Sequence, residues 1–274
     1  MLKFYILEHV TGSLKRRGLE DESYATRKQH ALREALPHFK HHLWVINSID
    51  HGLPQDRRRI FFVGVHSACM QALGKSELDD PQTVLRSHQC SLADILSDHE
   101  SMPDIMSTRT EKQVHNIKAY NELLQTKMTV EPYVKVACCD HSRNPSGRFG
   151  SFFHIDVTGT ITTSDPGKWV MGQVPGKVWG YGRSLSMSER ARAQGIMPCS
   201  LSAVHNPRVL NKLIGNSIPV NSVGAVIAAV CPALVAFESC IQSQVVRQMP
   251  PAQSESDALA DDLIAEQTRY EEVD

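Results

Sequence analysis

The chain has 274 residues, 41% of them hydrophobic and 22% charged, so it is long enough to bury a substantial core in one large domain or two small ones. Seven cysteines, an odd number without regular spacing, exclude the class of small secreted proteins held together by disulfides. No apolar run is expected to span a bilayer, and the apolar start of the chain is too short for a secretory signal. We therefore expect an intracellular protein, in the nucleus of a eukaryote or in the cytoplasm or nucleoid of a prokaryote.

The formal net charge of −1 is unevenly distributed along the chain. Between Glu255 and Asp274 there are eight acidic residues and one basic residue, so the rest of the chain is mildly basic. Residues 241–274 include Pro250 and Pro251 and few large apolar side chains, and we expect them to form a flexible acidic tail with no assignable role. A basic body is compatible with a polyanionic partner but does not demonstrate one.

The first part of the chain alternates between strand and helix patterns. Residues 4–10 form a short apolar run typical of a strand buried on both faces, and residues 24–36 have the apolar spacing of a helix that ends at Pro37. Two β-rich runs follow, at 43–49 and 59–65. This order predicts part of an α/β sheet.

Residues 70–180 have a different character, rich in loops. Thr110 and Gln113 have the spacing of a capping box, which predicts the start of a helix with apolar residues along one face. Short strands are predicted at 133–138 and 159–164, among Gly, Pro and Asn residues. The pattern indicates an inserted, irregular α+β region.

From Arg183 onward the helical α/β character returns, and residues 218–237 predict an apolar helix interrupted by Pro232. Neither an internal repeat nor a low-complexity block is visible. The adjacent Cys138 and Cys139 lack the usual two-residue spacer of zinc ligands and no second ligand pair follows, so no metal site is predicted.

Four short stretches carry recognisable motifs. They are ILEHV (6–10), PQDRRRIFFVGV (54–65), RSLSMSERARAQGI (183–196) and LIGNSIPV (213–220). In this order they resemble the second half of the DNA cytosine-5 methyltransferase family, whose counterparts are Glu-Asn-Val, Gln-x-Arg-x-Arg, Arg-x-Leu-Ser/Thr-x-x-Glu-x-x-Arg-x-Gln-Gly and Gly-Asn-Ser-hydrophobic-Pro-Val. Each match alone is weak, but four in the family's order, with an insert of suitable size between the second and third, are specific.

The resemblance implies an α/β fold containing part of the Rossmann-like sheet of S-adenosylmethionine-dependent methyltransferases. Residues 1–69 would supply the last strands of the catalytic domain, 70–180 an irregular α+β target-recognition domain, 181–240 the return to the catalytic domain, and 241–274 the tail. The implied partner is double-stranded DNA, and no membrane partner is implied.

Such enzymes are understood to flip cytosine out of the duplex and attack C6 with a cysteine thiolate, so that C5 accepts the methyl group of S-adenosylmethionine. The resemblance implies that Glu8 is the acid that stabilises the charge on the ring at N3. It also implies that Arg59 contacts the base O2 and that Arg57 contacts adjacent phosphates. Arg58 should point the other way if the strand has begun there.

The resemblance assigns further residues to three roles. Asn216 and Ser217, in a turn before the last helix, either hold that turn together or, as the resemblance implies, contact the cofactor. For the DNA backbone it implies Arg148, Thr160, Thr162 and Lys168. Structural roles are implied for Gln55, Arg183, Glu189, Arg192, Gln194 and Gly215, which support the recognition domain and its neighbouring turn.

Two departures from the family pattern stand out. His9 replaces the asparagine of Glu-Asn-Val. The family's Gly-rich cofactor loop and catalytic Pro-Cys lie before that strand, whereas this chain begins seven residues before Glu8. Neither Pro198-Cys199 nor Cys231-Pro232 occupies the nucleophile's place in the order.

These departures leave open three interpretations of the chain: a truncated gene product, one subunit of a split methyltransferase that needs a separate N-terminal half, or a non-catalytic homologue retained for DNA binding or regulation. In each case the chain alone is expected to be inactive. The strand at 4–10 would then become an exposed apolar edge, and the helix at 218–237 would lose part of the surface that it normally covers.

Overall fold

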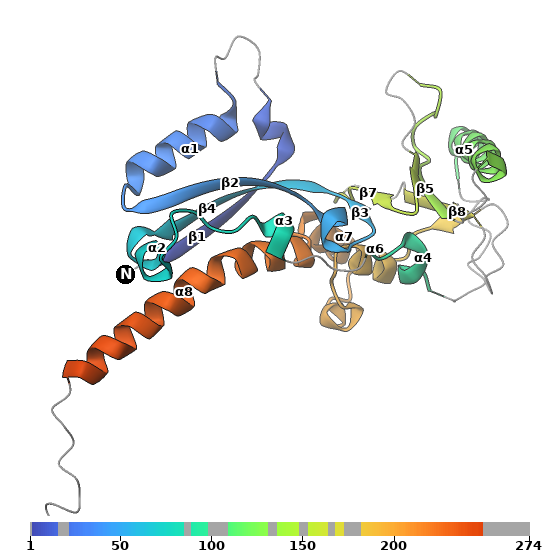
Figure 1. Ribbon diagram of the computed structural model, residues 1–274. Helices are drawn as coiled ribbons and strands as arrows, with labels where there is room; N and C mark the ends of the chain where they lie inside the picture. The colour runs from blue at the N-terminus through green and yellow to red at the C-terminus, as the bar shows by residue number, and fades with distance from the viewer. Residues whose placement is uncertain are drawn as a thin grey trace, which may run out of the picture.

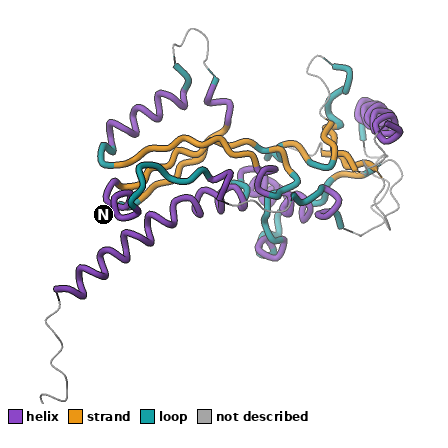
Figure 2. The backbone as a smooth tube through the Cα atoms, viewed as in Figure 1, coloured by secondary structure: helices purple, strands orange, loops and turns teal. Residues whose placement is uncertain are grey.

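The structure, a computed structural model, describes residues 2–15, 22–84, 89–97, 109–130, 136–147, 153–163, 168–172 and 182–248. Within these ranges it is a mixed α/β protein with two separate groups of strands, joined by α8 and by short connections (Figures 1 and 2). Its N-terminal sheet lies between helices, and its C-terminal sheet lies beside α5. The predicted α/β character is therefore confirmed.

The N-terminal sheet contains three antiparallel strands in the order β1-β4-β2. The strands are β1 (Phe4–Val10), β2 (Phe39–Asn47) and β4 (Arg58–His66). Because β4 is central and apolar from Ile60 to Val65, its side chains are buried on both faces, whereas β1 is at the edge and none of its side chains is fully buried. The predicted strand at 4–10 is confirmed, but the prediction that it is buried on both faces is wrong.

Alternation along β4 assigns its side chains to two cores. One core contains Ile60 and Phe62 under α1 (Tyr24–Ala35), which begins at the cap residue Ser23. The other contains Phe61 and Val63, packed against α2 (Ser67–Leu73) and α8 (Val220–Gln248). Figure 1 shows α1 on one side of the sheet and α8 on the other. The short helix α3 (Pro81–Val84) also packs against α8.

The long helix α8 includes Pro232 and continues to Gln248, past the predicted start of the tail at 241. The span Pro207–Gln244 contains an 18-residue window of mean hydropathy 2.1, long and apolar enough to cross a membrane by length and composition alone. The prediction that no apolar run reaches this length is therefore wrong. Val226 and Val230 on this helix are buried against the sheet, as in the core helix of a globular fold, although only 33% of the window is buried.

The C-terminal sheet has the strand order β6-β5-β8-β9. Its strands are β5 (Val136–Asp140), β6 (Phe153–Ile155), β8 (Lys168–Gly172) and β9 (Arg183–Ser184). Helix α5 (Glu111–Val130) begins with the predicted capping box of Thr110 and Gln113 and buries Ile117 and Leu124 against one face. The adjacent Cys138 and Cys139 lie on opposite faces of β5, in separate cores.

The other face of this sheet is covered by α4 (Leu92–Ile95), α6 (Met187–Ala193) and α7 (Pro207–Asn216), which share one core with β5 and β8. A short parallel pair, β3 (Gln55–Asp56) and β7 (Thr158–Gly159), connects the two groups of strands. The remaining short elements are the 3-10 turns η1 (Thr11–Leu14), η2 (Ser48–His51) and η4 (Pro198–Leu201). Elements from 183 to 216 thus pack with the C-terminal sheet, and α8 returns to the N-terminal one.

Candidate functional site

Glu8 and Arg59, two of the residues singled out by the sequence, form an ion pair in the structure. Arg59 Nε lies 2.7 Å from Glu8 Oε1. The pair follows from the strand register, because Glu8 faces Phe61 and Val10 faces Arg59, so the two side chains are diagonal neighbours on the α8 side of the sheet. The Arg59 side chain is 11% exposed and that of Glu8 is 22% exposed, so a ligand can still reach the carboxylate.

Burial lowers the pKa of the Arg59 guanidinium, while the nearby Glu8 carboxylate acts in the opposite direction. For Arg57, burial together with the positive charge of Arg59 lowers the pKa to about 10, against the raising effect of Glu8. With a pKa of about 10, the Arg57 guanidinium remains charged at neutral pH. Two cations and one carboxylate at the end of β1 and β4 give this region a positive potential.

Arg57 is 3% exposed and its guanidinium donates to three backbone carbonyl oxygens. Arg57 Nη1 lies 2.7 Å from the oxygen of Ile161, and Nη2 lies 3.1 Å from that of Gly215 and 2.8 Å from that of Ser217. This geometry joins the strand to the loop after β7 and to the turn after α7. It favours a structural role for Arg57 over the phosphate contact implied by the resemblance.

Asn47, at the end of β2, was missed by sequence reasoning. Its Oδ1 accepts a hydrogen bond from the Arg57 backbone N–H (2.9 Å), and its Nδ2 donates to Asp56 Oδ1 (2.8 Å). The one feature of the sequence that points to this bridging role of Asn47 is its position as a polar residue at the end of an apolar run. Gln55 is fully buried nearby, and neither atom of its side-chain amide has a hydrogen-bond partner among the described residues.

The residues expected at the DNA backbone are arranged around β7. Thr160 Oγ1 donates to the backbone oxygen of Asp56 at 3.0 Å, which holds the loop against β3. Thr162 is exposed, whereas Lys168 on β8 is 9% exposed and lies beside Gly159. Arg148 lies outside the described residues. Of the three positions that the structure describes, Thr162 is therefore the one with an exposed side chain.

Glu189 is the centre of a buried network at the start of α6. Its carboxylate pairs with both Nη atoms of Arg183 and accepts from the backbone N–H groups of Ser186 and Ser97, each at 2.8 Å. Arg192 Nη2 donates to Ser97 Oγ at 2.5 Å. Burial raises the pKa of Glu189, but the hydrogen bonds from Arg183, Ser97 and Ser186 outweigh it and hold that pKa below the usual value. These contacts support the structural role that the sequence assigned.

The turn between α7 and α8 holds the remaining predicted residues. A Cβ at Gly215 would lie 2.4 Å from the backbone nitrogen of Thr163, so this close approach of helix and loop requires glycine. Gln194 Nε2 donates to the oxygen of Ile214 at 3.2 Å, and Ser217 Oγ donates to the same oxygen at 2.7 Å. Asn216 is exposed at the end of α7.

These residues fit only the margin of a cofactor site. The exposed amide of Asn216 makes no hydrogen bond to any other described residue and can contact a ligand, whereas the hydroxyl of Ser217 is already engaged. Two adjacent side chains cannot enclose a molecule the size of S-adenosylmethionine. Within the described residues, the chain offers a contact to such a cofactor rather than a complete site.

His9 points away from the ion pair. Because its side chain is on the opposite face of β1 from Glu8, its ring packs against Tyr24 at the start of α1, with the ring centroids 5.1 Å apart. The replacement of asparagine therefore alters the contact between β1 and α1. It does not bring a titratable ring next to the carboxylate.

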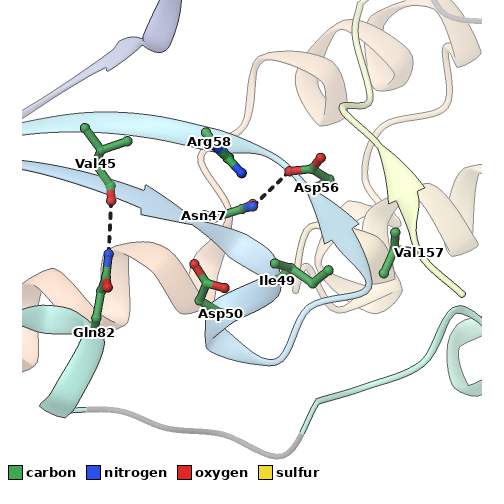
Figure 3. A pocket seen from close by; sticks show the side chains of 8 residues that line it. All are labelled: Val45, Asn47, Ile49, Asp50, Asp56, Arg58, Gln82 and Val157. Carbon is green, nitrogen blue, oxygen red and sulfur yellow. Dashed lines mark hydrogen bonds between the residues drawn. The ribbon is translucent and has the colours of Figure 1, made fainter. Parts of the chain in front are cut away.

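A pocket of about 430 Å³ lies beside the exposed Arg58 (Figure 3). Alternation along β4 places the Arg58 side chain on the opposite face of the strand from that of Arg59. Its polar lining consists of Asn47, Asp50, Asp56, Arg58 and Gln82, with apolar groups from Val45, Ile49 and Val157. Among the described residues, Arg58 has no ion-pair partner. The pocket shares no lining residue with the Glu8–Arg59 pair, so the two are separate features.

Comparison with known proteins gives a match to a family model. The model for C-5 cytosine-specific DNA methylase matches residues 3–231. A curated relative, the type II methyltransferase M.DdeI of Desulfomicrobium norvegicum, is 28% identical over 102 residues, which are 35% of this chain and 22% of that protein. The matched region thus spans about a fifth of the relative's length.

Solved structures with the same general description are similar at low identity. Dnmt2 methyltransferase of S. pombe is 15% identical with a TM-score of 0.47, covering 85% of this chain and 67% of that one. The methyltransferase EhMeth of Entamoeba histolytica is 13% identical with a TM-score of 0.44, and the match covers 87% of this chain and 63% of that one. A putative DNA modification methyltransferase from an E. coli prophage is 14% identical with a TM-score of 0.48, and the match covers 85% of this chain and 70% of that one.

Proposed function

The chain belongs to the C-5 cytosine-specific DNA methylase family, and we propose that it forms the C-terminal part of an enzyme that methylates C5 of a flipped cytosine in DNA. The observation that carries this proposal is the ion pair of Glu8 and Arg59, which places an acid and a guanidinium 2.7 Å apart at a partly exposed strand end. S-adenosylmethionine is the methyl donor that the family implies, and Asn216 would contribute a contact to it.

The two side chains match the charge that develops during this reaction. Addition of a thiolate to C6 pushes negative charge onto N3 and O2 of the ring. Glu8 would hold a proton at N3 and hydrogen-bond the exocyclic amine, and Arg59 would donate to O2. In the absence of a base, Arg59 instead holds the Glu8 carboxylate in place. Binding of cytosine would exchange part of that contact for contacts to the ring.

The residues around this pair would form the wall of a DNA-binding cleft. Arg57 fixes the strand end to the loop that carries Ile161 and Thr162, and to the turn at Gly215. Arg190 Nη2 donates to the oxygen of Thr162 at 3.2 Å and holds that loop from the other side. In this proposal residues 70–180 form the target-recognition domain, Thr162 contacts the phosphate backbone, and Glu189 keeps α6 in position.

The residues given do not include the family's Pro-Cys nucleophile in its place before Glu8. No Pro-Cys precedes Glu8 in this sequence, and Cys199 and Cys231 are exposed on η4 and α8. We propose that methyl transfer also uses a portion that carries the cysteine and the cofactor loop, either in the same polypeptide or as a separate N-terminal methyltransferase half. A non-catalytic DNA-binding or regulatory role is the second candidate, because Arg57 and Arg190 hold the loop at Ile161 and Thr162 without any contribution from a nucleophile.

An assay of labelled methyl transfer to DNA distinguishes the catalytic function from the non-catalytic one. We expect no transfer by the purified chain alone, and transfer after mixing with an N-terminal half from a family member that is itself inactive. Labelling by the chain alone would contradict the proposed division of the site. DNA binding by the chain, without transfer in any mixture, would support the non-catalytic alternative.

A further inference from the structure

Residues 158–163 connect the region proposed as the target-recognition domain to the rest of the chain. They lie inside that region, yet their hydrogen-bond partners include residues before and after it. The Thr158 N–H donates to the oxygen of Pro54 at 2.8 Å, and Thr160 Oγ1 donates to that of Asp56 at 3.0 Å. The short parallel pair of β3 and β7 belongs to the same connection.

Three side chains from outside the region hold the backbone oxygens of residues 161–163. The oxygens of these consecutive residues accept, in order, from Arg57 Nη1 at 2.7 Å, from Arg190 Nη2 at 3.2 Å and from Asn211 Nδ2 at 2.9 Å. Arg57 directly precedes β4, whereas Arg190 is on α6 and Asn211 is on α7. We call these three side chains the carbonyl clamp. Because they come from three separate elements, the segment is fixed relative to all three.

The clamp holds Thr162 with its side chain exposed. Ile161 is fully buried in the core of the C-terminal sheet, whereas Thr162 is exposed. Helix α7 packs directly against this part of the backbone, because a Cβ at Gly215 would lie 2.5 Å from the Thr162 carbonyl carbon. Asn211 lies one turn before Gly215, on the same side of that helix. The position of Thr162 is therefore set by a buried neighbour and by the clamp.

The clamp also links Thr162 to the ion pair of Glu8 and Arg59. Arg57 is two residues before Arg59, and its guanidinium donates to the oxygen of Ile161, the residue next to Thr162. Arg59 in turn lies 2.7 Å from Glu8. The place of Thr162 relative to the proposed base contacts is thus fixed by a short series of hydrogen bonds and covalent neighbours.

Two members of the clamp are outside the motif residues recognised in the sequence. Arg190 occupies an open position of the family pattern, directly after Glu189, and Asn211 precedes the LIGNSIPV stretch. Arg190 is 5% exposed, and burial of a guanidinium is costly unless acceptors compensate its desolvation. Asn211 Oδ1 is buried with no hydrogen-bond partner among the described residues, so the bond to Thr163 is the hydrogen bond that its amide makes there. Both side chains thus contribute to the loop that they hold.

We propose that Arg190 and Asn211 are positioning residues for methyl transfer. They act through Thr162, by holding its side chain at a fixed place relative to Glu8 and Arg59 before DNA binds. This inference rests on the function proposed above, in which Thr162 contacts the phosphate backbone. A loop that is ordered in advance loses less freedom on binding, and a correctly placed DNA backbone brings the flipped base to the Glu8 carboxylate.

The substitution Asn211→Leu tests the clamp without a change of charge. It keeps a side chain of similar size and removes the donor to Thr163. In fluorescence anisotropy, the full chain should bind duplex DNA about tenfold more weakly. The slope of log affinity against log salt should be unchanged, because no cation has been lost. The matched control is Val209→Ala, an exposed position on the opposite side of α7, which should bind as the unaltered chain does.

A double-mutant cycle shows whether Asn211 acts through Thr162. The substitution Thr162→Val keeps the shape of the side chain and removes its hydroxyl. In this background Asn211→Leu should weaken binding by less than about twofold, because the contact that it would misplace is already lost. The same tenfold loss in both backgrounds would contradict a role through Thr162.

Arg190 allows a test of rescue. Arg190→Met removes the donor to the Thr162 oxygen and should weaken DNA binding by at least about tenfold. Arg190→Lys retains a donor and a positive charge, and it should bind within about threefold of the unaltered chain. Thermal unfolding is measured on each variant. A lower midpoint in Arg190→Met, with unchanged affinity of the folded sample, would show a role in stability alone and overturn the proposal.

Kinetics of methyl transfer test the same positioning during the reaction. In the chain mixed with a family N-terminal half, Asn211→Leu should lower kcat by at least about tenfold and raise KM for DNA, because a misplaced backbone displaces the reacting base. If the unaltered chain neither binds DNA nor supports transfer, alone or in the mixture, the proposed function itself is contradicted. If it does both, and Asn211→Leu and Arg190→Met do both equally well, this inference alone is overturned.

Discussion

At the scale of single residues, three consecutive arginines have three different environments. Arg58 is exposed beside a pocket, Arg59 pairs with Glu8, and Arg57 is buried among carbonyl oxygens. The sequence predicted that Arg58 points away from its neighbours, because this follows from strand alternation, and the resemblance assigned Glu8 and Arg59 to contacts with the same cytosine ring. It could not predict the role of Arg57, since its acceptors lie more than 100 residues away and meet it only in the folded chain.

This difference predicts the effect of two matched substitutions. Arg57→Ala leaves two buried carbonyl oxygens and one partly buried one without their donor, so we expect the free energy of unfolding, measured in urea, to fall by about 3 kcal/mol. Arg58→Ala, one residue away and exposed, should change that free energy by less than about 0.5 kcal/mol. Equal effects of the two substitutions would contradict the structural role of Arg57.

The lowered pKa of Glu189 leads to a prediction of how the free energy of unfolding depends on pH. Its pKa in the folded chain is lowered, so its contribution is fully present above the pKa of the unfolded chain and is lost as pH falls through the folded value. The free energy of unfolding should therefore decrease in the acid range below the ordinary glutamate pKa. Glu189→Gln should be less stable at pH 7 and show a smaller decrease between pH 6 and pH 3. A parallel decrease in both proteins would contradict this account.

At the scale of elements, the predicted helices and strands are largely present. The way in which they pack against one another could not be predicted from the sequence. The apolar run at 4–10 is an edge strand, because strand order depends on which segments meet and not on local pattern. Likewise, within the described residues the strand predicted at 159–164 is limited to Thr158–Gly159, since the backbone oxygens of Ile161 and Thr162 are held by Arg57 and Arg190. The apolar helix predicted at 218–237 is present as α8, but it continues through Pro232 and ends at Gln248.

The contact between α7 and the loop at Thr163 can be tested with two glycines. Helix propensity favours alanine over glycine by about 1 kcal/mol. At Gly215, however, the new methyl group would collide with the Thr163 backbone, so Gly215→Ala should destabilise the protein and separate α7 from the loop. Gly224→Ala on α8 has open space and should stabilise it by up to about 1 kcal/mol. Thermal unfolding of both variants measures the difference.

At the scale of the whole molecule, charge separates a mildly basic body from an acidic tail. If the body binds DNA, the logarithm of affinity should fall linearly with the logarithm of salt concentration. Removal of residues 255–274 takes away eight acidic residues and one basic residue, so a chain of residues 1–254 should bind duplex DNA more tightly at low salt. Fluorescence anisotropy over a salt series measures this. Absence of binding by a folded sample would exclude a DNA-binding role for the isolated chain.

The central claim is that the Glu8 carboxylate acts on the cytosine ring. The most direct test is the rate of labelled methyl transfer by the chain mixed with a family N-terminal half, compared between Glu8→Gln and Glu122→Gln, an exposed carboxylate on α5. We predict that Glu8→Gln lowers the rate by about 100-fold or more, because proton donation at N3 is lost, and that Glu122→Gln leaves it unchanged. A Glu8→Gln protein that folds and methylates at the normal rate would contradict the account.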